Sequence, residues 1–195
     1  MIKQAIARHF PHHLGSCYPF LQDVYIADYT EKTKTEHIKK YVEFLAIQPN
    51  DIKFFSLYNP NLIKIDGIKF NNASFLDPNG QAKTQCECTF FPESSTNSSW
   101  IMFLELKYSC INRRNDLNIK KALAQLCATY HYYKEVGIIP KNGNSYLIVS
   151  LPEQHEPFVN SIITPAKIKN YKKLYKIILR PKNKVQIANH SLIYV

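Results

Sequence analysis

The longest apolar run in the chain, residues 100–108, carries two opposite charges inside it. Seven of these nine residues are apolar or aromatic, and the other two are Glu105 and Lys107. The run predicts a strand buried on both faces. Strand side chains alternate, so Glu105 and Lys107 share one face and lie about 7 Å apart. Burying a carboxylate and an ammonium group is costly unless they are paired, hydrogen-bonded or bound to a metal, and we therefore expect this strand to use them.

The hydrophobic pattern before this run predicts one helix and several strands. Thr33 and Glu36 form a capping-box pattern, and apolar residues then recur at helical spacing as far as Ala46. We expect this helix to end at Pro49. Strand-forming residues separated by turn residues predict extended segments at residues 53–58, 62–70 and 83–91. The polar turn at residues 92–99 predicts a hairpin that joins 83–91 to 100–108.

The second half of the chain alternates helical and extended patterns. The longest helical pattern runs from residue 115 to 136 and ends at Gly137. A strand is expected at 145–151, a helix within 165–175, and a strand pair at 176–180 and 184–188. This order predicts an α/β fold in one domain, with a mixed central sheet and helices on both of its faces.

Charge is unevenly placed along the chain. The net charge is +10, and eight basic residues follow Glu156 with no further acid. This asymmetry favours a polyanionic partner, nucleic acid first and an anionic membrane surface second, although a solvated lysine-rich surface has the same composition. The sequence has no apolar run long enough to span a membrane and no signal-peptide core. Five cysteines, an odd number, indicate free thiols and a cytoplasmic location.

A second carboxylate is expected beside Glu105. In the predicted hairpin, Glu87 lies on the strand next to it, so the two acids can be neighbours. Adjacent carboxylates repel each other unless a cation lies between them, and their oxygen atoms suit Mg²⁺ or Mn²⁺. Such an ion could polarise a phosphodiester, and Lys107 could orient the nucleophile or stabilise charge on phosphorus.

These residues resemble the PD-(D/E)XK nuclease superfamily, which has the restriction-endonuclease-like fold. The resemblance rests on Glu87, the polar hairpin, the Glu105-Leu106-Lys107 motif and Gln125 in the following helix. It implies that Glu87 and Glu105 are metal ligands with the Leu106 carbonyl, that Lys107 is the catalytic lysine, and that Gln125 lies near the substrate or that lysine. It covers a core at about residues 33–151 of a single domain, 1–195, with a basic extension at 157–195.

The chain departs from the family pattern at two places. The first acid of the family is usually an aspartate, whereas this chain has Glu87, and its extra methylene moves the carboxylate by about 1 Å. Many relatives carry a tyrosine four residues after the glutamine, where this chain has Thr129. Asp66 and Asp77 compete with Glu87 as the acid beside Glu105.

Other residues are candidates for binding nucleic acid or for the core. The predicted phosphate-binding residues are Lys121, Lys169, Lys172, Lys173 and Lys176. Three tyrosines could stack on unpaired bases or belong to the core: Tyr130, Tyr132 and Tyr133. We interpret His9, His12 and His13 as a solvated loop rather than a metal site. We expect Cys86 and Cys88 on one strand face, as core residues rather than zinc ligands.

The sequence therefore predicts a metal-dependent nuclease that acts on nucleic acid, with DNA as the first choice, in defence against foreign DNA or in repair. One alternative is a non-catalytic nucleic-acid-binding module that keeps the nuclease scaffold. Another is a subunit that cuts only with a partner protein that supplies targeting. The resemblance alone suggests a homodimer.

Overall fold

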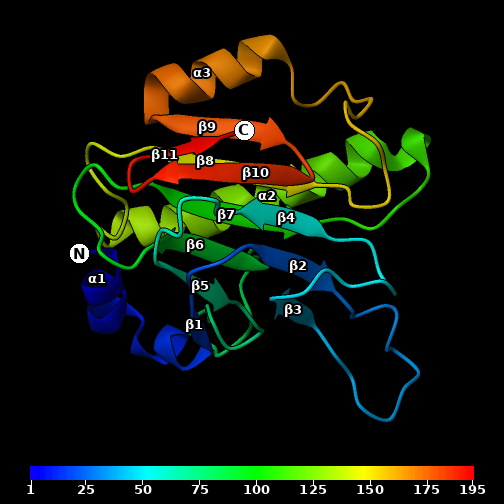
Figure 1. Cartoon of the computed structure of the whole chain (residues 1–195), viewed down its shortest axis with the longest axis horizontal. Helices are drawn as coiled ribbons and strands as arrows, with labels where there is room; N and C mark the ends of the chain where they lie inside the picture. Colours follow the sequence, from blue (N-terminus) through cyan, green and yellow to red (C-terminus); the bar gives the residue numbers. More distant parts are fainter.

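The central layer of the molecule is a six-stranded mixed sheet (Figure 1). The computed structural model describes all residues from 1 to 195. In spatial order this sheet contains β1 (Cys17–Phe20), β5 (Ile65–Lys69), β6 (Cys88–Pro92), β7 (Ile101–Leu106), β8 (Ser145–Ser150) and β9 (Ile177–Pro181). The pairs from β1 to β7 are antiparallel, and β7, β8 and β9 are parallel to one another. The expected β6–β7 hairpin is confirmed.

A second, five-stranded sheet packs on one face of the first. Its order is β11 (Leu192–Tyr194), β10 (Lys184–Asn189), β4 (Phe55–Tyr58), β2 (Val24–Asp28) and β3 (Val42–Leu45). Only the β10–β4 pair is parallel. The strands predicted at 176–180 and 184–188 are formed as β9 and β10, but their predicted pairing is wrong, because β9 pairs with β8 while β10 enters the other sheet.

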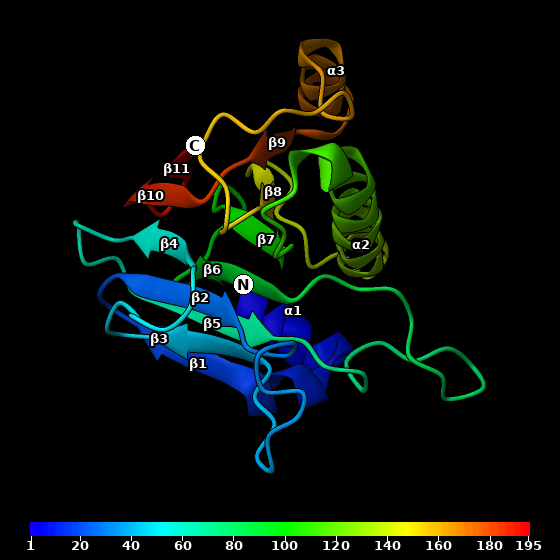
Figure 2. The same ribbon diagram turned by 90° about the vertical axis from the view of Figure 1, so that its right-hand side faces the viewer.

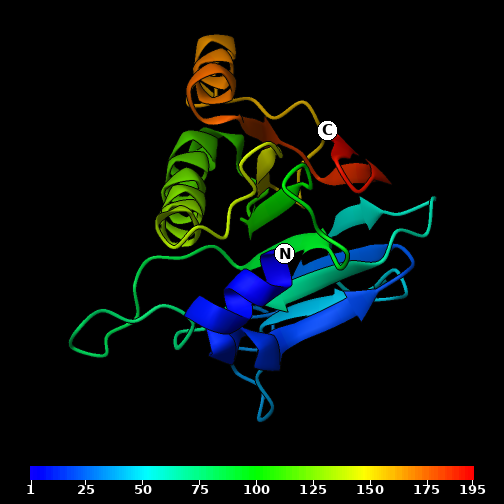
Figure 3. The same ribbon diagram turned by 90° about the vertical axis from the view of Figure 1, so that its left-hand side faces the viewer.

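Helices cover the opposite face of the six-stranded sheet (Figures 2 and 3). They are α1 (Ile2–His9), α2 (Asn115–Glu135) and α3 (Pro165–Tyr175), with 3₁₀ turns η1 (Pro11–Ser16) and η2 (Asn112–Arg114). The α/β class, α2 and α3 agree with the sequence prediction. The prediction of helices on both faces of the sheet was wrong, because the second sheet covers one of these faces.

The alternation along β7 explains the three layers. Ile101 and Phe103 pack into the core shared with α1 and α2. Met102 and Leu104 pack into the core between the two sheets. Every residue of β7 is buried, as the sequence predicted for a strand covered on both faces. No helix in the chain has the length and apolar character needed to cross a bilayer.

The helix predicted at residues 33–46 is not formed. A turn-rich loop follows Tyr29, and Val42–Leu45 is strand β3, paired with β2 in the register Ala27–Glu43. The Thr33 hydroxyl donates to the carbonyls of Tyr29 and Lys40 and accepts from the Lys40 N–H, so it closes the loop. Tertiary pairing with β2 overrides the helical spacing, and α1, β1 and β2 arise in residues 1–32, where the sequence predicted no element.

Candidate active site

Glu87 and Glu105 lie side by side at one end of the β6–β7 hairpin. The register pairs Cys88 with Leu104, and extending it by one residue places Glu87 opposite Glu105. One Glu87 carboxylate oxygen accepts the Leu106 N–H at 3.3 Å, and the Glu87 carbonyl accepts the Phe70 N–H at 2.8 Å. The hairpin predicted from the sequence therefore brings the two carboxylates together.

Glu105 is fully buried and paired with Lys107. The Lys107 ammonium group lies 2.5 Å from Glu105 Oε1. Glu105 Oε2 is buried and has no hydrogen-bond partner. The Lys107 N–H donates to the Ser150 carbonyl at 2.9 Å, which fixes the backbone just beyond β7. The structure thus confirms that Glu105 and Lys107 share one face, and it leaves one carboxylate oxygen unsatisfied.

Burial and repulsion from a neighbouring carboxylate raise the pKa of both acids. Burial raises the pKa of Glu105 to about 7, against the opposing effect of Lys107. Burial, followed by repulsion from Glu105 and Asp28, raises the pKa of Glu87 well above its ordinary value. Clusters of perturbed acids in a cleft are typical of functional sites. A bound cation would favour the charged form of both groups.

Helix α2 fixes the segment that leads into β6. The Gln125 side-chain amide donates to the Gln85 carbonyl at 3.0 Å. One turn later, the Thr129 hydroxyl accepts the Cys86 N–H at 2.8 Å. Gln125 therefore positions the chain just before Glu87 rather than contacting Lys107. Thr129, at the place where many relatives of the resembled family have a tyrosine, supplies the second anchor.

Asp28 is a third acid of this site, and the sequence reasoning missed it. It is the last residue of β2, and its N–H donates to the Tyr108 hydroxyl at 3.1 Å. Tyr108 in turn donates to the Lys53 carbonyl at 2.7 Å. Asp28 belongs to a distant segment of the other sheet, so no spacing in the sequence links it to Glu87. The only local signal was an acid at the end of an apolar stretch.

Two cavities open beside these residues. The first, of about 800 Å³, is lined by Asp28, Glu87, Leu106 and Lys107, and its far wall comes from the segment before β4. The second, of about 1090 Å³, is lined by Asp28, Glu87 and Gln125. Asp28 and Glu87 border both. Glu105 lines neither cavity and lies beneath Glu87 and Lys107.

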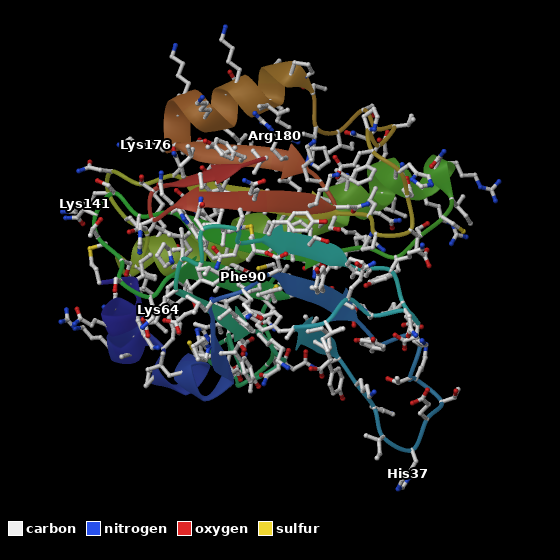
Figure 4. All side chains as sticks on the ribbon, viewed as in Figure 1. His37, Lys64, Phe90, Lys141, Lys176 and Arg180 are labelled. Atoms are coloured by element: carbon white, nitrogen blue, oxygen red, sulfur yellow. The ribbon has the colours of Figure 1, made fainter.

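The predicted phosphate-binding lysines fall into two groups. Lys121 is exposed and lines the second cavity. The lysines of α3, which packs beside the outer strand β9, line neither cavity: Lys169, Lys172, Lys173 and Lys176. Lys176 caps the C-terminus of α3 in a left-handed conformation, and its ammonium group donates to the Lys141 carbonyl (Figure 4).

The competing acids lie elsewhere. Asp66 is buried and accepts a hydrogen bond from the Lys3 ammonium group at 3.0 Å, beneath α1. Asp77 accepts from the Asn79 and Gln81 N–H groups and so forms a turn. Neither residue lines either cavity. Glu87 is therefore the acid that the fold places beside Glu105.

Several other sequence candidates are structural. Tyr130 and Tyr133 are core residues, and Tyr132 is half-buried with the Lys83 ammonium group 4.1 Å from its ring centroid. His13 is buried too and hydrogen-bonds the Tyr133 hydroxyl and the Ser74 carbonyl, so a solvated loop was the wrong interpretation there.

The cysteines are free thiols, as predicted. Cys86 and Cys88 are both buried, but they enter different cores, Cys86 on the helix side and Cys88 between the sheets. The expectation of a shared face was wrong, because regular strand geometry begins only at Cys88.

The donor set at the hairpin end has the chemistry of a hard-cation site. No group of three or more histidine, cysteine, aspartate or glutamate side chains is arranged to hold a metal ion. Mg²⁺, however, commonly binds through one or two carboxylates and takes its remaining ligands from water and substrate phosphates. The unpartnered Glu105 Oε2 is the oxygen that such a cation would satisfy. Glu87 and Glu105 therefore have the ligand chemistry for a divalent ion that retains water ligands.

Comparison with known proteins returns no matching family model, no matching curated protein and no matching solved structure.

Proposed function

We propose that this chain is a divalent-metal-dependent nuclease that hydrolyses phosphodiester bonds, with DNA as its substrate. The observation that carries this proposal is the convergence of Glu87, Glu105 and Lys107, of which Glu87 and Lys107 line a cavity. Paired carboxylates beside a lysine are the groups that metal-assisted phosphodiester hydrolysis requires. The net charge of +10 supports a polyanionic substrate.

The proposed mechanism assigns a separate role to each residue. Glu87 and Glu105, with the Leu106 carbonyl, would hold Mg²⁺ or Mn²⁺, which when bound polarises the phosphate and lowers the pKa of water. Lys107 would turn from Glu105 to the substrate and donate hydrogen bonds to the phosphate oxygen on which charge develops. Gln125 and Thr129 would keep Glu87 in place. Asp28 would accept a proton or a hydrogen bond from the attacking water, since it lines the same cavity as Lys107.

We further propose that the six-stranded sheet with its helical layer is a restriction-endonuclease-like core. The support is local: Glu87 lies directly before the first strand of a hairpin, Glu105-Leu106-Lys107 stands at the end of the second, and Gln125 lies on the following helix. The second sheet would then be an addition to that core. A homodimer, and a role in defence or repair, remain predictions from the resemblance.

Cleavage assays with matched variants test the proposal. Supercoiled plasmid and single-stranded DNA are incubated with Mg²⁺ or Mn²⁺ and with wild type, Glu105→Gln, Lys107→Ala or Lys64→Ala. Lys64 is exposed and lines neither cavity, so its variant controls for preparation and net charge. We expect cutting by wild type and Lys64→Ala, a loss of at least 100-fold in the other two, and no cutting with EDTA. Equal activity in all four proteins would place the nuclease elsewhere or in a contaminant.

A second function is a nucleic-acid-binding module without catalysis. The observation in its favour is that Glu105 lines neither cavity and is covered by its contact with Lys107. In that case the pair would stabilise the strand end and bind no metal. Binding of DNA that is unchanged by EDTA, with no cutting under any condition, would favour this module or a subunit that requires a partner protein.

A further inference from the structure

The two cavities adjoin at Asp28 and Glu87, and we refer to them together as the trough. Asp28 and Glu87 line both, so the cavity of about 800 Å³ and that of about 1090 Å³ meet at these two carboxylates. The first arm runs toward the segment before β4. The second arm runs toward α2 and the loop between β2 and β3. An occupant that reaches Glu87 can therefore continue to both sides of it.

Acids and lysines are interspersed along the trough. Five acids (Asp28, Glu31, Asp51, Glu87 and Glu153) and three lysines (Lys32, Lys53 and Lys107) line the first arm, so phosphates there need a bound cation to offset the acids. Three acids (Asp28, Glu43 and Glu87) and three lysines (Lys69, Lys83 and Lys121) line the second arm.

Lys53 in the first arm and Lys121 in the second are exposed, and neither takes part in an ion pair within the chain. Between them lie the half-buried carboxylates Asp28 and Glu87. Unpaired cations on both sides of an acidic centre suit a chain of phosphates whose middle phosphate is shared with a bound cation.

Each arm also offers an aromatic surface beside its lysine. Phe54 follows Lys53 in the first arm and is half-buried. Tyr41 lines the second arm and is 63 % exposed, although it lies directly before a strand. Exposed aromatic side chains near cations are platforms on which unpaired bases stack, and Tyr41 is the exposed one of the two, because the Phe54 ring packs edge-on against Tyr25. Tyr41 directly precedes β3 and so ends the loop between β2 and β3. His37 lies at the tip of this loop, which projects from the molecule (Figure 4).

We propose that this trough binds a single-stranded polynucleotide, with one stacked base in each arm and the central phosphate over Glu87. The position of that phosphate rests on the proposed nuclease function. The choice of single strand rests on the arms, because the bases of a duplex are already stacked on each other and cannot lie against Phe54 and Tyr41. Since Glu105 is buried beneath Glu87, the phosphate must also enter the trough rather than rest on its rim.

Equilibrium binding tests the proposal independently of cleavage. A fluorescent oligonucleotide of eight nucleotides, free or locked in a hairpin stem, is titrated with protein in the presence of Ca²⁺, a hard cation that carboxylates bind. A denaturing gel verifies that the oligonucleotide stays intact. We expect the free strand to bind at least 10-fold more tightly than the stem. Tyr41→Ala should weaken binding about 10-fold, the size of a lost base–aromatic stack.

Lysine variants locate the strand in the trough. Lys53→Ala and Lys121→Ala should each weaken binding and lower the salt-dependence slope by about 0.7, the value for one phosphate contact on a single strand. Lys64 lies on another part of the surface (Figure 4), so Lys64→Ala should leave both the affinity and the salt-dependence slope unchanged. Tyr41, Lys53, Lys64 and Lys121 are all exposed, so circular dichroism should show that all four variants are folded.

The outcomes separate this inference from the proposed function. Equal or tighter binding of the hairpin stem overturns the proposed single-strand binding in the trough. Single-strand binding that none of the trough variants weakens also overturns it. Single-strand binding lost in these variants, with no cleavage under any metal condition, supports the trough and contradicts the nuclease. Metal-dependent cutting of duplex that requires Glu105, without preference for the single strand, supports the nuclease and contradicts the trough.

Discussion

At the scale of single residues, Glu105 and Lys107 are coupled through burial. Glu105 is itself closed to solvent, with one oxygen against Lys107 and the other without a partner. Removing one member of such a pair leaves an uncompensated buried charge, whereas removing both charges leaves none. The stability of the two variants should therefore be strongly non-additive.

A double-mutant cycle at pH 8 measures this coupling. We expect Lys107→Met to lower the free energy of unfolding by about 2 kcal/mol, because the carboxylate of Glu105 loses its counter-charge. Glu105→Gln in the same chain should recover most of that loss. Urea denaturation in EDTA provides the values. Additive losses would show that the pair does not interact and that Lys107 is free for other contacts.

His13 is the residue for which we expect a clear pH effect on stability. Burial lowers the pKa of His13 from 6.5 to about 4, against the opposing effect of the Ser74 carbonyl. The unfolded chain therefore binds a proton at a higher pH than the folded chain does. It follows that stability is lost as the pH falls from about 6.5 toward 4.

The measurement compares wild type with His13→Gln. Between pH 7 and pH 4 we expect wild type to lose about 2 kcal/mol more than the variant, since each unit of pKa shift corresponds to about 1.4 kcal/mol. His9→Gln, which changes an exposed side chain, should keep the wild-type dependence. Parallel curves for wild type and His13→Gln would mean that His13 titrates alike in both states.

At the scale of elements, the sequence correctly predicted segments with a strong local pattern, including the strands β4, β5 and β8. The β6–β7 hairpin needs only a polar turn, and α2 carries its own apolar pattern and ends before Gly137. The helix predicted from Thr33 to Ala46 failed because β3 is stabilised by pairing with β2, which local spacing does not encode. Tyr41 and Ile38, interpreted as parts of a helical core face, are exposed instead.

The residues of the candidate site also divide into those that the sequence predicted and those that it missed. Glu87, Glu105 and Lys107 were found from the sequence because one hairpin holds them all. Asp28 was missed because it enters from the second sheet, and that sheet is assembled from strands of both chain ends. The role of Thr129 was also missed, since a threonine inside a helix gives no sign that its hydroxyl accepts from a neighbouring strand.

The contact between α2 and the start of β6 gives a prediction for an element. Thr129→Val removes the acceptor of the Cys86 N–H and leaves a buried donor unsatisfied. We expect a loss of about 2 kcal/mol in unfolding free energy. If the proposed nuclease function holds, cleavage should fall as well, because Glu87 follows this anchor directly. Thr129→Ser keeps the hydroxyl and should stay near wild type in both assays.

A variant that loses stability without losing cleavage would mean that β5 and β7 suffice to hold Glu87. The Phe70 and Leu106 hydrogen bonds to Glu87 are the contacts that would then do so.

At the scale of the whole molecule, the lysines proposed to contact phosphates lie in two separate places. Lys53 and Lys121 line the trough, whereas the lysines of α3 stand beyond β9, at the outer edge of the six-stranded sheet. No residue of α3 is buried. The sequence grouped the α3 lysines with the site because their positive charge suits the phosphates of a nucleic acid. The fold, however, places them two strands away from β7. A nucleic acid would need extra length to contact both.

This separation predicts an effect that depends on substrate length. Replacing Lys169, Lys172 and Lys173 together by alanine should leave binding of an eight-nucleotide strand unchanged, because the trough takes up most of its phosphates. For a 40-nucleotide strand, we expect weaker binding and a salt-dependence slope lower by about 2, as three lost phosphate contacts would give. Fluorescence anisotropy at four salt concentrations measures both slopes. An equal loss for both lengths would place α3 at the trough, and no loss for either would make its lysines a solvated surface.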